Sequence, residues 1–269
     1  MDRSTFSTRH IPAYAAAALA LTLGCWRDHA IESRRTVDDL GTYLPSSALF
    51  TLRVAGDEPS FRFGPPYGMA LGGDWEGWGA DTVGFYVPKT SQFFLQTENA
   101  GGYTRIAFGF GPPNAGFLPI AGDWDGDGRD SVGLYDPFTS TFHLRNSNTT
   151  GGDDQTFQFG TYKPNQVPVA GKWSGGTRDG VGLYDKDTAT FALRISEEPG
   201  AAPLTFVFGP PRSFPIPGDW DGDGIDTVGV FDRANGRFLL RNSNAPGPPD
   251  QVIEFGGVPN LPMKGRWKR

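Results

Sequence analysis

The chain has few of the residues from which most catalytic centres and disulfide frameworks are built. It contains one cysteine and three histidines in 269 residues, so no disulfide can form within it. No zinc cluster and no Ser-His-Asp triad can be assembled from so few of these residues. A glycosidase needs only two carboxylates, and this class of enzyme stays open as an alternative.

Acidic residues outnumber basic residues, and the sequence has no long apolar run. The formal net charge of −6 argues against nucleic-acid binding, which needs a basic surface. An apolar stretch over residues 11–23 is 13 residues long, whereas a membrane-spanning helix needs about 20. The stretch follows Arg3 and Arg9, an arrangement typical of an export signal.

Residues 21–25, Leu-Thr-Leu-Gly-Cys, resemble a bacterial lipobox, in which the cysteine becomes the lipidated first residue of the mature protein. Gly24 is the small residue expected before the cysteine, and the residues before it follow the usual order only in part. We therefore expect a signal peptide over 1–24, a linker over 25–35 and a lipid anchor at Cys25. The anchor would hold the protein at a membrane, on the cell surface or in the periplasm. The alternative is ordinary secretion with Cys25 incidental.

Glycine and proline are abundant, at 38 and 23 residues, and fall at fixed places of a repeat. The sequence Gly-Asp-Trp-Asp-Gly-Asp-Gly occurs at 122–128 and again at 218–224, and weaker copies begin at Gly73, Gly171 and Gly265. The tryptophans of the five copies are 49, 49, 47 and 47 residues apart. A period of this size with several short apolar runs per unit is typical of a β-propeller.

Each unit contains four short segments in which apolar and polar residues alternate, as in half-buried strands. Turn sequences rich in Asp-Pro, Asn and Gly separate them. In the clearest unit the predicted strands are residues 118–124, 131–135, 141–145 and 155–159. The matching segments of a later unit are residues 227–231, 236–241 and 251–255.

The two ends of the chain complete one unit between them. Residues 38–45, 50–53 and 61–64 match the second, third and fourth strands, and residues 265–267 match the first. We therefore predict an all-β fold, a single five-bladed β-propeller over 36–269 whose C-terminal strand joins the N-terminal blade. Such closure removes free sheet edges; an open array or a larger ring between chains is the alternative. The predicted blades are 36–69 with 260–269, then about 70–118, 119–167, 168–214 and 215–259.

The heptapeptide at 122–128, followed by an acid and Val-Gly-Leu-Tyr-Asp at 132–136, resembles the FG-GAP/VCBS-type repeats of bacterial surface proteins. These repeats are distantly similar to the propeller of integrin α subunits. The resemblance extends from about Thr36 to the C-terminus and is specific in two units. It implies a propeller with calcium in loops between strands and a role in surface adhesion or recognition.

Two loops carry the donor set that calcium prefers. Calcium takes six to eight oxygen ligands, and aspartates at positions 1, 3 and 5 of a loop with glycine at position 6 can wrap around it. The alternative is a solvated acidic turn. The predicted ligands are Asp123, Asp125 and Asp127 in one loop and Asp219, Asp221 and Asp223 in the other. A weak site would have Asp74 and Glu76, with Trp78 in place of the third acid.

Position 8 of the loop is aspartate in all five units: Asp38, Asp81, Asp130, Asp179 and Asp226. One of these units has Lys172, Ser174 and Gly176 at positions 1, 3 and 5 and cannot bind calcium in this way. The acid at position 8 is therefore interpreted first as structural, accepting hydrogen bonds from loop amides. Asp130 and Asp226 are kept as second-rank calcium ligands.

Two further residue types repeat once per blade. The tryptophans Trp75, Trp124, Trp173, Trp220 and Trp267 are predicted to pack in and between blades, whereas Trp78 is a candidate for stacking on a sugar ring. Arg53, Arg145, Arg194 and Arg241, with Gln96 in the remaining unit, either cap turns or build equivalent ligand pockets. We favour the structural role. After export His143 would be left at a variable surface position.

Together these features predict a non-catalytic, calcium-binding propeller at the cell surface that recognises a glycan or a protein. The alternatives are a structural module without its own ligand and a carbohydrate-active enzyme. Buried acids that break the repeat and face the central channel would favour the enzyme. An open, aromatic-lined pocket repeated between blades would favour recognition, and flat, charged faces without a pocket would favour the structural module.

Overall fold

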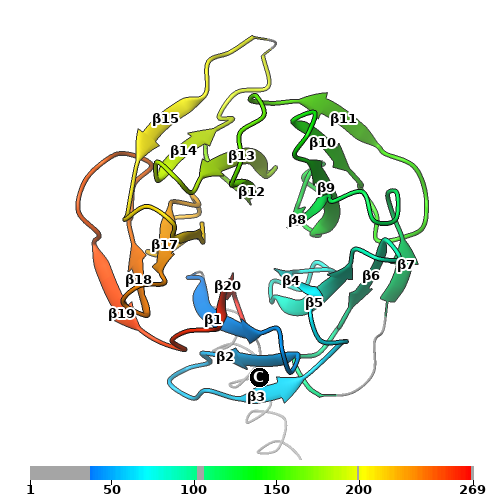
Figure 1. Ribbon diagram of the computed structural model, residues 1–269, viewed down its shortest axis with the longest axis horizontal. Helices are drawn as coiled ribbons and strands as arrows, with labels where there is room; N and C mark the ends of the chain where they lie inside the picture. Colours follow the sequence, from blue (N-terminus) through cyan, green and yellow to red (C-terminus); the bar gives the residue numbers. More distant parts are fainter. Residues whose placement is uncertain (1–36, 102–105, 199, 268–269) are drawn as a thin grey trace, which may run out of the picture. The chain divides into compact units, whose positions relative to one another are not determined.

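The computed structural model describes residues 37–101, 106–198 and 200–267. In these ranges every regular element is a β-strand, and twenty strands form five four-stranded antiparallel sheets. The sheets are arranged around a central axis as the blades of a propeller (Figure 1). The all-β, five-bladed fold predicted from the sequence is confirmed. The expected signal peptide, linker and Cys25 lie outside the described residues.

The first blade is assembled from both ends of the propeller sequence. It contains β20 (Leu261–Gly265), β1 (Asp39–Leu44), β2 (Leu49–Leu52) and β3 (Ser60–Arg62). Strand β20 pairs with β1 from Gly265 opposite Asp39 to Leu261 opposite Tyr43, and the two lie side by side in Figure 1. The predicted closure of the ring is confirmed.

The other four blades follow one another along the chain. Blade 2 has β4 (Met69–Gly73), β5 (Thr82–Val87), β6 (Gln92–Leu95) and β7 (Ile106–Gly109). Blade 3 has β8 (Leu118–Gly122), β9 (Ser131–Asp136), β10 (Thr141–Leu144) and β11 (Gln155–Gln158). Blade 4 has β12 (Gln166–Gly171), β13 (Gly180–Asp185), β14 (Thr190–Leu193) and β15 (Leu204–Val207). Blade 5 has β16 (Phe214–Pro215), β17 (Gly229–Asp232), β18 (Arg237–Leu240) and β19 (Gln251–Glu254).

Several predicted strands are a little longer than the observed ones. Strand β8 ends at Gly122, two residues before the predicted end, because Asp123 already accepts amide hydrogen bonds from the following loop. Strand β17 begins at Gly229, and Thr227 forms an isolated bridge with Gly218 instead.

The tryptophan of each repeat is a packing residue, as predicted. All five are 3–7% exposed, and the indole N–H of Trp124 donates to the carbonyl of Ser131 in the next strand. Gly122 precedes this ring, and a Cβ at that position would lie 2.9 Å from both the Trp124 ring and the Asp179 carboxylate. Glycine therefore allows the loop, the tryptophan and the neighbouring blade to approach closely.

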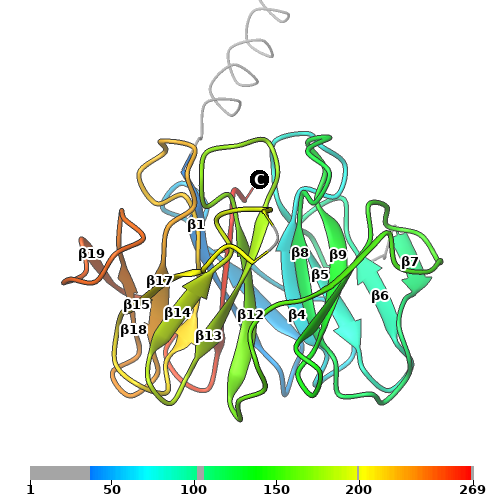
Figure 2. The same ribbon diagram turned by 90° about the horizontal axis from the view of Figure 1, so that it is seen from above.

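The innermost strand of each blade lines the axis of the propeller, and the Asp-rich loops lie at one end of it (Figure 2). Part of the channel wall is apolar and rich in proline, with Pro119, Pro168 and Pro215 among its residues. At the loop end, the lining is dominated by aspartates. The charged side chains of the channel are therefore concentrated at one of its mouths.

Candidate metal centre

The first aspartate of each complete loop organises the loop around its carboxylate. Asp123 Oδ1 accepts hydrogen bonds from the amides of Gly126 and Asp127 at 2.7 and 3.1 Å, and Oδ2 accepts one from Gly128 at 2.9 Å. Both glycines have positive φ, at 81° and 86°, a conformation that glycine adopts without strain. Asp219 folds the second loop in the same way, through the amides of Gly222 and Gly224.

This folding brings three carboxylates together in each loop. One oxygen from each of Asp123, Asp125 and Asp127 lies within 4.8 Å of the others, and the same holds for Asp219, Asp221 and Asp223. In the described ranges these two triads are the groups of three or more acids, histidines or cysteines with metal-binding geometry. A set of hard carboxylate oxygens fits calcium, with backbone carbonyls or water completing the coordination. In both loops the first acid is buried, and the last is exposed.

Burial also affects the pKa of the first aspartate in the second loop, Asp219. It raises the pKa of Asp219, while the amides of Gly224 and Gly222 act in the opposite direction by stabilising the charged carboxylate. A cation bound beside Asp219 would offset the cost of that buried charge.

The position-8 aspartates join neighbouring blades. In each of the five cases the carboxylate accepts a hydrogen bond from the backbone amide at position 1 of the adjacent blade, and the acid's own amide donates to the carbonyl of that residue. Asp130 and Asp226 do so with Asp74 and Lys172 and are not members of the triads. These carboxylates accept loop amides as expected, but each amide belongs to the preceding blade of the ring.

The loops that begin at Gly73 and Gly171 lack the complete set of three aspartates. Asp74 accepts the amides of Trp78 and Gly79 at 2.9 and 2.6 Å, so the first acid keeps its loop-folding role. Glu76 has a buried Oε2 without a hydrogen-bond partner, and the Trp78 side chain is 70% exposed. Asp74 and Glu76 are not part of a triad in the described residues. In the other incomplete loop, Lys172 lines the channel.

The position-8 acids and their neighbours enclose a cavity of about 320 Å³ at the mouth of the channel. Strand β20 brings a basic side chain to it, and Lys264 Nζ lies 3.3 Å from Asp38 Oδ2. Arg266 follows β20, and its Nε lies 3.8 Å from Asp38 Oδ1. Every acid that lines this cavity occupies position 1 or 8 of the repeat. No described acid of the cavity breaks the repeat in the way expected of a catalytic pair.

Burial and the neighbouring charges shift the pKa values of the groups in this cavity. Burial raises the pKa of Asp81 and of Asp179 to about 6, although Lys264 acts to lower both. Burial, together with the charges of Asp81 and Asp179, raises the pKa of Asp130 well above its usual range. Burial alone would lower the pKa of Lys264, but the surrounding carboxylates, with Asp38 foremost, raise it.

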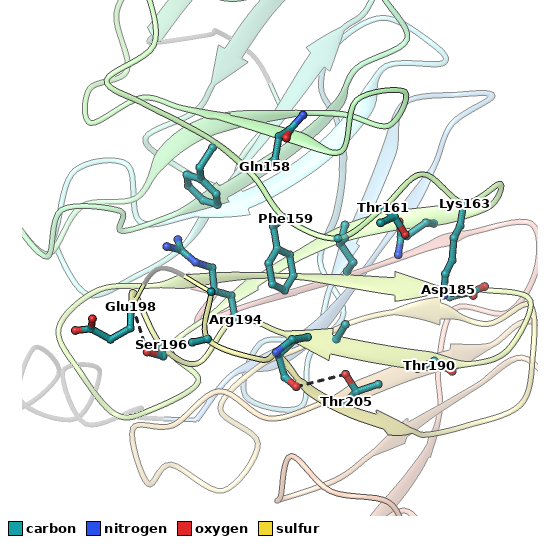
Figure 3. Close-up of a pocket in the computed structure, with 18 residues that line it drawn as sticks. Gln158, Phe159, Thr161, Lys163, Asp185, Thr190, Arg194, Ser196, Glu198 and Thr205 are labelled. Atoms are coloured by element: carbon teal, nitrogen blue, oxygen red, sulfur yellow. Dashed lines mark hydrogen bonds and ion pairs between the residues drawn. The ribbon is translucent and has the colours of Figure 1, made fainter.

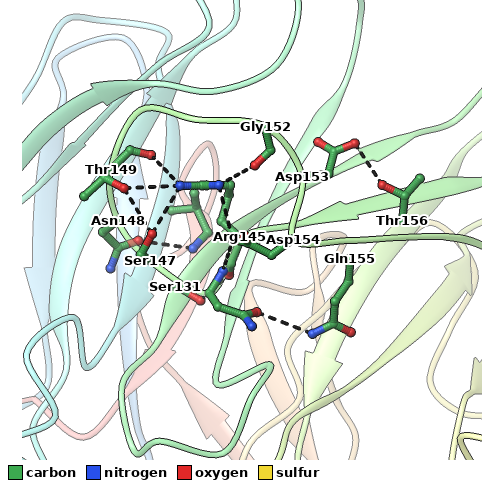
Figure 4. Close-up of polar contacts among 12 residues, drawn as sticks. Ser131, Arg145, Ser147, Asn148, Thr149, Gly152, Asp153, Asp154, Gln155 and Thr156 are labelled. Atoms are coloured by element: carbon green, nitrogen blue, oxygen red, sulfur yellow. Dashed lines mark hydrogen bonds and ion pairs between the residues drawn. The ribbon is translucent and has the colours of Figure 1, made fainter.

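The repeated arginines are used in two ways. Arg145 is buried within its own blade, where its guanidinium donates to the carbonyls of Gly152 and Thr149 and lies 3.2 Å from Asp154 Oδ2 (Figure 4). Arg241 likewise donates to carbonyls of its own loop. These two contacts fit the predicted capping role. Arg194 has its guanidinium 4.4 Å from the centre of the Phe157 ring of blade 3.

Two features were not recognised from the sequence. His143 is half-buried, stacks on Phe117 and bonds Asp153 at 2.8 Å, so it is more than a variable surface position. A groove between blades 3 and 4 was also missed. Its sequence signal is Ala192, which stands where blades 2 and 3 have Phe94 and His143.

No protein-family model and no curated protein matches this chain. In the described residues, no helix is long and apolar enough to cross a membrane.

Proposed function

We propose that this protein is a calcium-binding, non-catalytic propeller of the FG-GAP/VCBS type that recognises a glycan or a protein at the cell surface. The observation that carries the proposal is the pair of Asp triads, each with carboxylate oxygens within 4.8 Å of one another. Three carboxylates at this separation repel one another unless a cation lies between them. The two loops then act as calcium sites that fix the mouth of the propeller.

A recognition role fits the distribution of acids better than catalysis does. The acids at the channel mouth follow the repeat and are engaged in contacts between blades. A repeated acid that holds the ring together is a poor candidate for a proton donor or nucleophile at one particular place. Export and lipidation of Cys25 complete the proposal and would place the propeller at the membrane surface.

Calcium titration of the residue 30–269 fragment by isothermal calorimetry tests the metal sites. We expect two sites per chain and a rise in melting temperature with calcium that chelator reverses, because a ligand bound only by the folded state stabilises it. Asp125→Asn and Asp221→Asn should each remove one site, and the exposed Glu58→Gln serves as the matched control. Unchanged stoichiometry in both loop variants would refute the calcium sites.

Cellular fractionation tests the location separately. The full chain expressed in a bacterial host should be recovered with membranes and incorporate labelled palmitate, whereas Cys25→Ser should release it. Release of the unaltered chain into the medium without label would support ordinary secretion instead.

A further inference from the structure

A groove of about 550 Å³ lies between blades 3 and 4 (Figure 3). Its lining contains the aromatic rings of Phe157 and Phe159, small apolar side chains and several hydroxyl and amide groups. The residues that carry the argument are Phe159 from blade 3 and Gln166, Leu183, Ala192, Arg194 and Thr205 from blade 4.

The groove exists because two side chains that fill the corresponding space in blade 3 are replaced in blade 4. In blade 3 the rings of Phe117 and His143 stack with centroids 5.5 Å apart. Gln166 stands five residues before the inner-strand glycine, as Phe117 does, and Ala192 pairs with Leu183 as His143 pairs with Leu134. The replacement of the stacked pair by glutamine and alanine leaves the space open.

Blade 2 fills its equivalent space in another way. Phe85 and Phe94 stack with centroids 4.9 Å apart, and Phe94 occupies the place of Ala192. Blades 2 and 3 therefore use an aromatic pair where blade 4 has a groove, whereas blades 1 and 5 have Thr51 and Leu239 at the place of Ala192.

The groove also holds polar groups that the fold leaves available. Gln166 is 9% exposed, and its Oε1 has no hydrogen-bond partner, an arrangement that costs free energy unless a ligand or water donates to it. Where Arg145 donates to loop carbonyls, Arg194 forms an ion pair at 3.2 Å with Glu197, whose side chain is 74% exposed. An exposed pair of this kind is easily rearranged.

The charges of the lining are balanced. Lys163 and Arg194 are offset by Asp185 and Glu198, and Lys163 Nζ lies 3.4 Å from Asp185 Oδ2. The remaining polar groups are hydroxyls and side-chain amides, and Phe159 offers an aromatic face. Aromatic rings pack against apolar faces, while amides and hydroxyls pair with hydroxyl groups.

We propose that this groove binds a short, uncharged saccharide, with Phe159 against an apolar face of a sugar ring and Gln166 accepting from a hydroxyl. This inference deepens the proposed function by assigning recognition to one inter-blade site. The volume suits one or two sugar rings, since small-molecule sites commonly measure about 300–1,000 Å³.

The test transfers the blade 3 pair into blade 4. Gln166→Phe with Ala192→His should rebuild the stack and fill the groove with residues that the same fold already accommodates. The control is Tyr67→Ala, which removes an exposed aromatic that does not line the groove. The full chain and both variants are screened in calcium on an array of neutral and uronic-acid oligosaccharides, and calorimetry follows with the strongest hit.

We expect a neutral oligosaccharide to bind, the double variant to lose at least tenfold in affinity and Tyr67→Ala to bind as before. Melting temperature and calcium stoichiometry report whether the variants are folded. Unchanged binding in the folded double variant, a preference for acidic saccharides, or no hit for the folded wild type would each overturn the groove proposal. Calcium stoichiometry of the wild type tests the proposed function independently, so the two failures are distinguishable. If the double variant does not fold, Ala192→Phe alone, which copies the residue found in blade 2, replaces it.

Discussion

The backbone amide of Asp219 donates a hydrogen bond of 2.9 Å to the carboxylate of Asp38, although 181 residues separate them in the chain. The amide of Asp38 in turn donates to the carbonyl of Asp219 at 2.8 Å. The same two-way contact recurs between each pair of neighbouring blades. Here it joins blade 5 to blade 1, the point where a chain folded into a ring must close.

Replacing Asp38 by alanine tests this contact. The substitution removes the acceptor of the Asp219 amide and the partner of Lys264, whose Nζ lies 3.3 Å away. A buried donor and a poorly compensated ammonium would remain, and we expect the free energy of unfolding to fall by about 2–4 kcal/mol. Urea denaturation measures the change, with the exposed Glu58→Ala as control. A loss no larger than that of the control would show that the contact does not stabilise the ring.

A second prediction concerns pH. Because burial raises the pKa of Asp81 to about 6 in the folded protein, the folded state binds more protons than the unfolded state between about pH 4 and pH 6. The contribution of Asp81 to stability is therefore largest below about pH 4 and decreases as pH rises toward 6. Asp81→Asn should remove this part of the pH dependence, on the order of 2 kcal/mol.

Chemical denaturation in chelator at pH 4, 5, 6 and 7 measures the effect. The informative quantity is the difference between wild type and Asp81→Asn at each pH, because other carboxylates titrate in both proteins. If that difference is constant across the range, Asp81 does not titrate as the structure indicates.

Much of the fold could be predicted from the sequence because the repeat encodes it several times. The tryptophan spacing gave the blade length, and the match of the two chain ends to one unit gave the closure by β20 and β1. Strand ends were less predictable. At Gly122 the end is set by amide bonds to Asp123, which depend on the folded loop.

The part of the site formed by residues close together in the sequence could be predicted. Asp123, Asp125 and Asp127 lie within one tight loop, so their spacing along the chain already implies their proximity. The partner of Asp130, in contrast, is an amide 56 residues away, and no local pattern names it. The groove at Ala192 depends on which side chains fill a space between blades, and this becomes visible only when the blades are packed.

The two arginines at equivalent positions should differ in their contribution to stability. Arg145 is 7% exposed and holds its loop through several carbonyl and hydroxyl contacts (Figure 4). Arg145→Ala should lower the free energy of unfolding by about 2–4 kcal/mol, because it removes the several charged hydrogen bonds that hold the loop and leaves a cavity where a buried side chain was. Arg194→Ala should cost about 1 kcal/mol, since it removes a contact with the Phe157 ring and a surface ion pair. Thermal and urea denaturation compare them, and equal losses would contradict the distinction.

The closure of the ring can be tested through its last tryptophan. Trp267 is 3% exposed, and its indole N–H donates to the carbonyl of Leu40 at 3.0 Å, which ties the end of the propeller to its first strand. Trp267→Ala should cost about 3–5 kcal/mol, as should Trp124→Ala at the equivalent place within a continuous blade. Trp78→Ala, at a side chain 70% exposed, should change stability by less than about 0.5 kcal/mol. If the ring were open in solution, Trp267→Ala would resemble Trp78→Ala rather than Trp124→Ala, because an unpaired last strand buries no indole. Urea denaturation of the three variants therefore distinguishes a closed propeller from an open array of the same blades.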